Sequence, residues 1–200
     1  MRKIRELFKL LIALLLFWLY LPHIVIYLFK RGSSKYAINE DMKRYESKLS
    51  LKIPKFFLLI YLLHNNWAYR TLYYYRIGPI LSFLFGWWRP KDRYFDLSAT
   101  MKLGPGAYFA HPRSTGINAN SIGCNFSCRQ LTTIGNKRDG DNKNRPVIGD
   151  NVTLGTNVTI IGSIHIGNNV TIGAGSVVVK DIPDNCVVVG NPAKIIRMLE

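Results

Sequence analysis

The residue best suited to acid–base chemistry in this sequence is His111, which lies in an irregular stretch rich in proline, glycine and serine. An imidazole titrates near neutral pH, so it can accept the proton of a hydroxyl group as a general base. His23 and His64 lie in apolar segments and are expected to be packed or to lie at a membrane interface, and His165 is expected to face solvent. The sequence contains no phosphate-binding loop, dinucleotide fingerprint, zinc-ligand spacing or nucleophile elbow. His111 is therefore the candidate base.

The three cysteines, Cys124, Cys128 and Cys186, lack the spacing of a metal site. Cys128 falls at an inward position of the repeat described below, where a small hydrophobic side chain belongs. We expect three packed, unpaired thiols in a reducing compartment, with no disulfide and no bound metal.

His111 lies in the part of the chain that follows a six-residue repeat, which is clearest over residues 147–178. This period fits neither a helix nor a long alternating strand, but it fits a short strand followed by a corner. Three such units complete one triangular coil of ~18 residues, so the repeat predicts a parallel β-helix. A run of edge strands in a β-sandwich would not hold the period. The large inward residues are Ile148, Leu154, Ile160, Ile166, Ile172 and Val178, and the smaller inward series is Val152, Val158, Ile164, Val170 and Ser176.

The repeat extends less regularly back to residue 94. Ile134 and Ile148 are 14 residues apart, two more than two repeat units. The surplus falls within the polar segment 136–145, which is predicted to be a loop that projects from the coil and to take part in binding. After the repeat, residues 193–199 are expected to form a short closing helix.

The first half of the chain combines apolar runs with most of the positive charge. Residues 1–95 hold 17 Lys and Arg against 5 Asp and Glu, a net charge of +12 out of +15. This pattern favours an anionic membrane surface over nucleic acid, for which no recognition module is present. Residues 10–29 carry no charged side chain. Three forms remain open for them: a bent segment lying in or on one leaflet, a full span, or a buried helix.

We divide the chain into three regions. Residues 1–31 are a hydrophobic, membrane-associating segment, residues 32–93 an α-helical region, and residues 94–200 the β-helix domain. Helices are expected at residues 39–49 and 56–75, and Trp87 and Trp88 resemble an interfacial anchor. The predicted fold class is mainly β, with an α-helical N-terminal half.

Several motifs lie at fixed places around the coil. Asp96 stands fifteen residues before His111, and Thr115-Gly116 follows it. Residues 175–178 read Gly-Ser-Val-Val, and residues 190–193 read Gly-Asn-Pro-Ala. Together with residues 66–78, these motifs make the chain, from about residue 39 onward, resemble the serine acetyltransferase group of hexapeptide-repeat acyltransferases. The resemblance implies a left-handed coil, a homotrimer and acetyl-CoA as co-substrate.

The resemblance also implies roles for single residues. His111 would be the general base, and Asp96 would orient its imidazole. The coenzyme would lie in a groove between the β-helices of neighbouring chains in a trimer. Its pantetheine arm would follow the backbone, and a phosphate would lie near a lysine. The residues implied to contact it are Gly155, Thr156, Ala174 and Lys194.

Two departures from that group bear on the acceptor. Arg145, followed by proline, stands where serine-using members have a histidine, and residues 112–114 lengthen the turn after the catalytic histidine. Arginine is permanently charged and only donates hydrogen bonds, so it would disfavour the ammonium group of L-serine. Arg145 and Arg113 are therefore predicted to contact the acceptor. The alternative is that Arg145 braces its own loop against Asp139 or Asp141.

The sequence thus predicts an acetyl-CoA-dependent O-acetyltransferase closest to serine O-acetyltransferase. Two alternatives remain: an O-acetyltransferase for a sugar hydroxyl in capsule or other surface-polysaccharide biosynthesis, and a non-catalytic β-helix scaffold. The expected partner is a small-molecule or glycan acceptor and no nucleic acid. Because acetyl-CoA is cytoplasmic, we expect the protein to be cytoplasmic, at the cytoplasmic face of the membrane.

Overall fold

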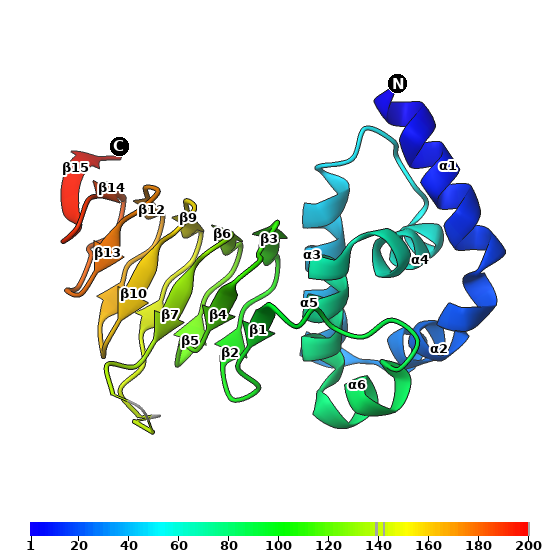
Figure 1. Cartoon of the computed structure of the whole chain (residues 1–200), viewed down its shortest axis with the longest axis horizontal. Helices are drawn as coiled ribbons and strands as arrows, with labels where there is room; N and C mark the ends of the chain where they lie inside the picture. The colour runs from blue at the N-terminus through cyan, green and yellow to red at the C-terminus, as the bar shows by residue number, and fades with distance from the viewer. Residues whose placement is uncertain (139, 142, 200) are drawn as a thin grey trace. The chain divides into compact units, whose positions relative to one another are not determined.

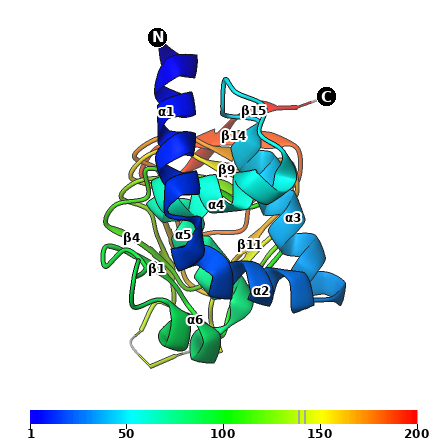
Figure 2. The same cartoon turned by 90° about the vertical axis from the view of Figure 1, so that its right-hand side faces the viewer.

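The computed structural model describes residues 1–138, 140–141 and 143–199. The chain divides into two compact units, Met1–Asp92 and Arg93–Glu200. The first is built from helices and the second from stacked short strands (Figure 1, Figure 2).

The helical unit contains six α-helices within the described residues. The predicted helix 56–75 is divided at Asn66, whose side chain accepts a hydrogen bond from the Tyr69 backbone N–H at 2.9 Å and so caps the second part. The helix predicted from residue 39 begins earlier, at Gly32. The elements are α1 (Arg2–Leu15), a 3₁₀ turn η1 (Phe17–Tyr20), α2 (Leu21–Phe29), α3 (Gly32–Glu46), α4 (Lys55–Asn65), α5 (Trp67–Ile77) and α6 (Pro79–Phe85).

The core of this unit forms around α4 and α5. Residues 58–63 of α4 are all buried, and α4 packs on both α1 and α5. A buried ion pair joins α5 to α3, with Nε of Arg76 2.8 Å from Oδ2 of Asp41. Nη1 of Arg70 donates to the Leu63 carbonyl oxygen at 2.8 Å. The arginines among the tyrosines of α5 therefore hold helices together.

His23 and His64 are both packed against aromatic side chains, as predicted. Nε2 of His23 lies 3.0 Å from the hydroxyl oxygen of Tyr74, and Nδ1 of His64 lies 2.9 Å from that of Tyr20. Burial lowers the pKa of His23 to about 4. Burial, together with the positive charge of Arg89, lowers the pKa of His64.

No single helix in the described part of the chain has both the length and the apolar composition of a membrane span. Helix α1 and the segment Phe17–Phe29 pass that test only as a pair, and the pair is bent by 73° at the break between them.

The second unit is a stack of coils, whose strands form three sheets (Figure 1). Strands of successive coils pair in parallel, so the predicted parallel β-helix is confirmed. The first sheet holds β1 (Phe95–Leu97), β4 (Thr115–Ile117), β7 (Thr133–Gly135), β10 (Thr159–Ile161) and β13 (Val177–Val178). The second holds β2 (Lys102–Leu103), β5 (Ser121–Ile122), β8 (Val147–Ile148) and β11 (His165–Ile166). The third holds β3 (Tyr108–Ala110), β6 (Ser127–Arg129), β9 (Thr153–Leu154), β12 (Thr171–Ile172), β14 (Cys186–Val189) and β15 (Lys194–Met198).

The pairing register gives the length of each coil. Ile148 pairs with Ile166 and Ile160 with Val178, in each case 18 residues apart, which is three repeat units. Ile122 pairs with Ile148, 26 residues apart, so the intervening coil holds eight additional residues. All eight fall between β7 and β8. The sequence predicted two repeat units between Ile134 and Ile148 and therefore only two surplus residues; the structure has one repeat unit there and eight additional residues.

Stacked corners fix each coil to the next. At the corner between the second and third sheets, four asparagines adopt positive φ angles of 54–57°, a region that asparagine tolerates. Three side-chain amide hydrogen bonds of 2.7–3.0 Å link the four, each from the asparagine of one coil to that of the next. At the same corner, a Cβ on Gly149 would lie 2.8 Å from the Gly167 carbonyl oxygen, so the approach of the coils requires glycine. The asparagines are Asn125, Asn151, Asn169 and Asn185.

The end of the chain differs from the prediction. Residues 194–198 form β15, which pairs antiparallel with β14, instead of a closing helix. The outer strand of the third sheet leaves backbone groups unpaired, and a hairpin satisfies them, whereas a helix would not.

Acidification is expected to destabilise the helical unit. Unfolded His23 takes up a proton below a pKa of about 6.5, whereas the folded unit resists protonation down to about 4. The free energy of unfolding should therefore fall by roughly 3 kcal/mol across that interval. All four tryptophans lie in this unit, so urea unfolding followed by fluorescence between pH 7.5 and 4.5 reports on it. His23→Gln should flatten the dependence, and equal slopes in both proteins would contradict this.

A charge placed inside the coil is expected to unfold it. Ile160 is 0% exposed, and Ile160→Asp would bury an unpaired carboxylate, costing several kcal/mol. Val179→Asp, at a position 48% exposed, is the matched control and should leave the far-ultraviolet circular dichroism spectrum unchanged. A folded Ile160→Asp protein with wild-type thermal stability would refute the inward assignment of the repeat.

Candidate active site

His111 lies at an exposed corner of the coil, between the third sheet and the first. Ala110 pairs with Arg129, and Gly116 pairs with Thr133. Ala110 and Gly116 are six positions apart in the sequence, whereas Arg129 and Thr133, at the same corner of the next coil, are four apart. The corner thus contains two additional residues, and His111 itself has a left-handed φ of 52°. The longer turn carries the imidazole on the outside of the coil.

The backbone of this turn is tied to its surroundings. The His111 carbonyl oxygen accepts a hydrogen bond from the Arg113 N–H at 2.7 Å. The Arg113 carbonyl oxygen accepts one from the Leu131 N–H of the next coil at 2.9 Å, and the Thr115 N–H donates to the Tyr94 carbonyl oxygen at 3.0 Å. The base therefore sits on a defined corner of a regular scaffold.

Asp96 lies in β1, where it pairs with Gly116 and turns its side chain outward. Asp96 therefore lies beside β4, the strand that follows the His111 corner. Its role as the orienting carboxylate stays a prediction.

The residues predicted to contact the coenzyme fall largely on the same corner. The Asn157 N–H donates to the Gln130 carbonyl oxygen and the Gly175 N–H to that of Thr156, each at 2.9 Å, which continues the ladder that begins at Arg113. Gly155 and Thr156 are thus two coils beyond His111, and Ala174 is three coils beyond it. Lys194 is exposed in β15, at the edge of the third sheet.

Gly155 has a structural reason to be glycine. A Cβ at this position would lie 2.6 Å from the Ala174 backbone nitrogen, closer than atoms of neighbouring coils can come. Its small size serves the stacking of the coils, and contact with a coenzyme stays a prediction.

Arg145 lies at a different corner, between the first and second sheets, and only 8% of it is exposed. Its Nη1 donates to Oγ1 of Thr100 and to Oδ1 of Asn118, both at 2.9 Å. Within a single chain it therefore does not share the His111 corner. It braces the base of its loop against earlier coils rather than against Asp141, with which it forms no ion pair in the described residues. The other predicted partner, Asp139, lies outside the described residues.

Two exposed arginines accompany His111. Arg113, predicted from the sequence, lies in the same turn. Arg129 was not predicted, yet it pairs with Ala110, the residue before His111. The inter-coil register is the signal that identifies it, and the register depends on coil lengths that the sequence alone left uncertain.

The cysteines are free, as predicted. Burial raises the pKa of the Cys128 thiol, which is fully enclosed in the coil. No group of three or more candidate metal ligands occurs in the described residues. Among the described side chains of the His111 corner, the imidazole is the group suited to moving a proton near neutral pH.

Comparison with known proteins gives a consistent result. A family model described as bacterial transferase hexapeptide (six repeats) matches residues 145–180. The chain is 42% identical over 134 residues to WcaB of Escherichia coli (strain K12), provisionally named a colanic acid biosynthesis acetyltransferase, covering 66% of this chain and 76% of that protein. The structure of Neisseria gonorrhoeae serine acetyltransferase matches with a TM-score of 0.62 and 28% identity, over 84% of this chain and 67% of that one. Brucella abortus serine acetyltransferase in complex with coenzyme A shares the fold, with a TM-score of 0.55 and 22% identity over 82% of this chain and 68% of that one.

The fold and the sequence relationship together define a hexapeptide-repeat acyltransferase. The chain belongs to the serine acetyltransferase-like group of this family. It is an acetyltransferase, and the alternative of a non-catalytic scaffold is set aside.

Removal of the Arg145 side chain is expected to destabilise the coil. Arg145→Ala leaves the side-chain acceptors of Thr100 and Asn118 without their donor, which should lower the free energy of unfolding by about 1–3 kcal/mol. Arg138→Ala, an exposed change in the same loop, is the control. Urea unfolding followed by circular dichroism measures both. Equal stabilities for the two variants would contradict the bracing role.

Proposed function

We propose that this protein transfers an acetyl group from acetyl-CoA to a hydroxyl group of its acceptor, with His111 as general base. The observation that carries the proposal is the corner insertion that holds His111, the one exposed imidazole at that corner, on the same ladder as Thr156 and Ala174.

In the proposed reaction, the His111 imidazole accepts the hydroxyl proton as the acceptor oxygen attacks the thioester carbonyl carbon. A carbon–oxygen bond forms and the carbon–sulfur bond breaks. The imidazolium then returns its proton to the departing thiolate, so the products are an acetyl ester and free coenzyme A. General-base catalysis of this kind contributes typically ~10²–10⁴ in rate. Asp96 would stabilise the imidazolium transiently formed on His111.

The corner beyond His111 offers a suitable surface for the coenzyme. Gly155 and Thr156 are partly exposed and Ala174 is exposed, so small side chains leave the backbone accessible. Successive corners are spaced as neighbouring strands, ~4.8 Å apart, and so form a straight edge. We propose that the pantetheine arm follows this edge, with Lys194 near a phosphate. The Brucella structure of the same fold binds coenzyme A, which is the product that acetyl-CoA leaves in the proposed reaction.

For the acceptor, we favour a sugar hydroxyl over L-serine. WcaB, which is 42% identical to this chain, is provisionally named for colanic acid biosynthesis, and the chain covers 76% of it. Arg145 also replaces the histidine of serine-using members, and a permanent cation beside the acceptor would disfavour an ammonium group. L-Serine is the second candidate, because the matching solved structures include a serine acetyltransferase at 28% identity.

We further propose a homotrimer and a cytoplasmic location. Arg145 and His111 occupy different corners of one coil, so a single chain does not unite them. In a trimer, one chain's Arg145 corner would face another chain's His111 corner, and an acceptor role for Arg145 requires such an arrangement. Acetyl-CoA is a cytoplasmic metabolite, which supports placing the coil on that side.

His111→Ala should reduce acetyl transfer by at least about 10²-fold while leaving coenzyme A binding within about twofold, because the base acts in the transition state. Release of free thiol, assayed with L-serine, simple sugars and lipid-linked glycans, measures turnover, and calorimetry measures binding. His165→Ala, an exposed histidine on the second sheet, is the matched control. Near-wild-type turnover in His111→Ala would exclude the base assignment.

A further inference from the structure

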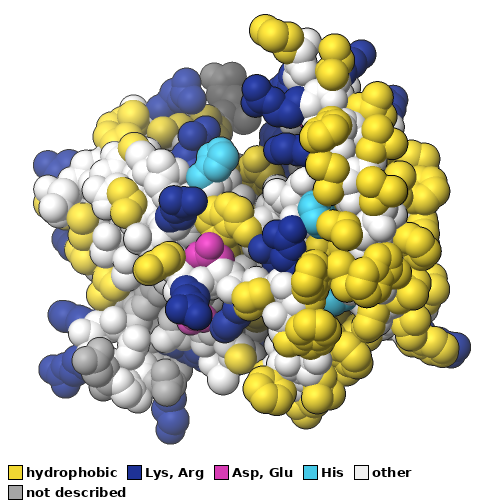
Figure 3. Space-filling view, turned by 45° about the vertical axis from the view of Figure 1, so that its right-hand side comes forward, with side chains coloured by type: hydrophobic (Ala, Val, Ile, Leu, Met, Phe, Trp, Pro, Cys, Tyr) yellow, Lys and Arg dark blue, Asp and Glu magenta, His cyan; other side chains and the backbone are white. Residues whose placement is uncertain are grey.

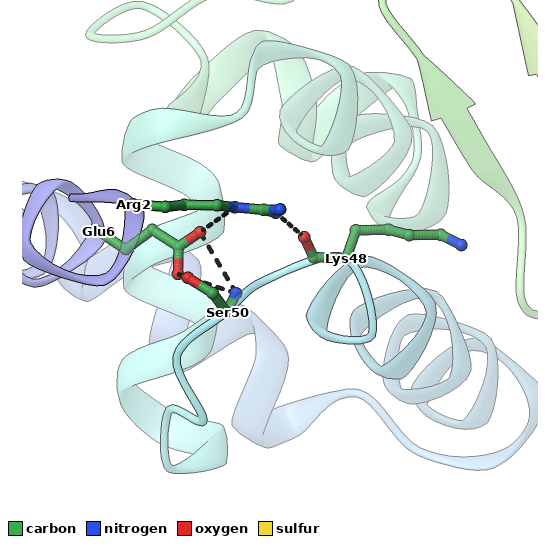
Figure 4. A network of polar contacts seen from close by, with 4 residues as sticks. All are labelled: Arg2, Glu6, Lys48 and Ser50. Atoms are coloured by element: carbon green, nitrogen blue, oxygen red, sulfur yellow. Dashed lines mark hydrogen bonds and ion pairs between the residues drawn. The ribbon is translucent and has the colours of Figure 1, made fainter.

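Helix α1 turns its acidic side chain toward the protein and most of its large hydrophobic side chains away from it. Glu6 is 7% exposed, and its carboxylate accepts hydrogen bonds from the Ser50 backbone N–H at 3.0 Å and the Ser50 hydroxyl at 2.7 Å (Figure 4). Nε of Arg2 lies 3.1 Å from the same carboxylate. Burial opposes ionisation of Glu6, but these hydrogen bonds outweigh it and lower its pKa. This polar anchor fixes which face of α1 points outward.

The outward face is apolar along the whole bent pair. The exposed residues of α1 follow helical spacing, and the apolar face continues through η1 and α2. Figure 3 shows hydrophobic side chains gathered over the helical unit. A surface in water rarely exposes so many large side chains together. The exposed residues are Ile4, Leu7, Phe8, Leu11, Leu15, Phe17, Trp18, Leu21, Val25, Leu28 and Phe29; they are called the apolar face below.

The charges beside the apolar face are almost all positive. Glu6 is the only acidic residue among residues 1–39, and it is buried. A surface that combines apolar side chains with unopposed cations is complementary to a bilayer with anionic headgroups. It is less suited to a protein partner, because protein–protein interfaces are depleted of lysine. The basic residues near the two ends of the apolar face are Arg2, Lys3, Arg5, Lys9, Lys30 and Arg31.

The opposite side of η1 and α2 is held by polar contacts to the rest of the unit. Besides the Tyr20–His64 and His23–Tyr74 contacts described above, the Tyr27 hydroxyl donates to Oδ1 of Asn39 at 2.8 Å. A membrane-crossing arrangement would break these contacts and leave their polar groups in hydrocarbon. The 73° bend also keeps α1 and α2 from forming one straight rod.

We propose that the apolar face inserts into one leaflet of an anionic membrane, with both of its ends on the same side. The helical unit is then a monotopic anchor, and neither α1 nor α2 crosses the bilayer. This inference does not depend on the acetyl acceptor or on His111.

Flotation of the full chain with lipid vesicles tests membrane docking. Wild type should float with vesicles containing phosphatidylglycerol and bind them more weakly at high salt or when they are purely phosphatidylcholine. Leu11→Ser/Val25→Ser removes side chains that are 52% and 47% exposed and should weaken partitioning by about tenfold or more. Leu131→Ser/Val179→Ser, at coil positions 49% and 48% exposed, is the matched control and should float like wild type.

Equal flotation of the two double variants would overturn the proposal. So would a wild type that fails to float while its apolar face mediates self-association, measured by analytical ultracentrifugation of the same variants. The far-ultraviolet spectrum of each variant verifies that it is folded.

Membrane sidedness tests the monotopic arrangement separately. Lys3→Cys, before the apolar face, and Tyr36→Cys, after it, are made in a Cys124→Ser background, because Cys128 and Cys186 are buried. Both positions should react with a membrane-impermeant maleimide in vesicles of one orientation and neither in the opposite orientation. Labelling of the two positions from opposite sides would establish a span and reject the monotopic anchor.

Discussion

The structure of the second unit depends on one constraint: successive coils must stack in register. Parallel strands supply the backbone hydrogen bonds of the sheets, but the corners decide whether neighbouring coils can approach. Glycines such as Gly149 and Gly155 leave no room for a Cβ, and the asparagine ladder at the corner between the second and third sheets links four coils through side-chain amides. A residue too large, or a coil too long, would have to be displaced outward. Insertions that interrupt the regular stack are not explained by stacking, so they are the places at which to look for function.

Two such irregularities stand out, and they have different consequences. The loop between β7 and β8 adds eight residues, and Arg145 at its base is buried, so this insertion is secured to the coil by hydrogen bonds to Thr100 and Asn118. The corner at His111 adds two residues and leaves the imidazole exposed. One irregularity is thus firmly braced at its base, and the other presents a group capable of proton transfer. Their separation on one chain is the physical reason for proposing a site completed by a neighbouring chain.

Much of the fold followed from the sequence because the coil interior has little tolerance. The period of six identified Ile148, Ile160 and Cys128 as inward residues, and all three are buried. The loop length was underestimated because hexad counting cannot tell a missing strand from a longer corner. The closing helix was wrong because the unpaired edge of β14, invisible in local sequence, determines the conformation of residues 194–198. The burial of Glu6 likewise depends on Ser50, which is distant in sequence, so the outward apolar face of α1 could not be assigned from hydrophobic pattern alone.

We propose that the acetyl donor binds along the corner bearing His111, continued through Thr156 and Ala174. Hydrogen–deuterium exchange of the full chain with and without coenzyme A tests this placement. With coenzyme A bound, we expect slower exchange in peptides that cover residues 111–114, 155–157 and 173–175, with little change at the asparagine corner around residues 125, 151 and 169. Protection confined to the asparagine corner, at saturating coenzyme A, would contradict it.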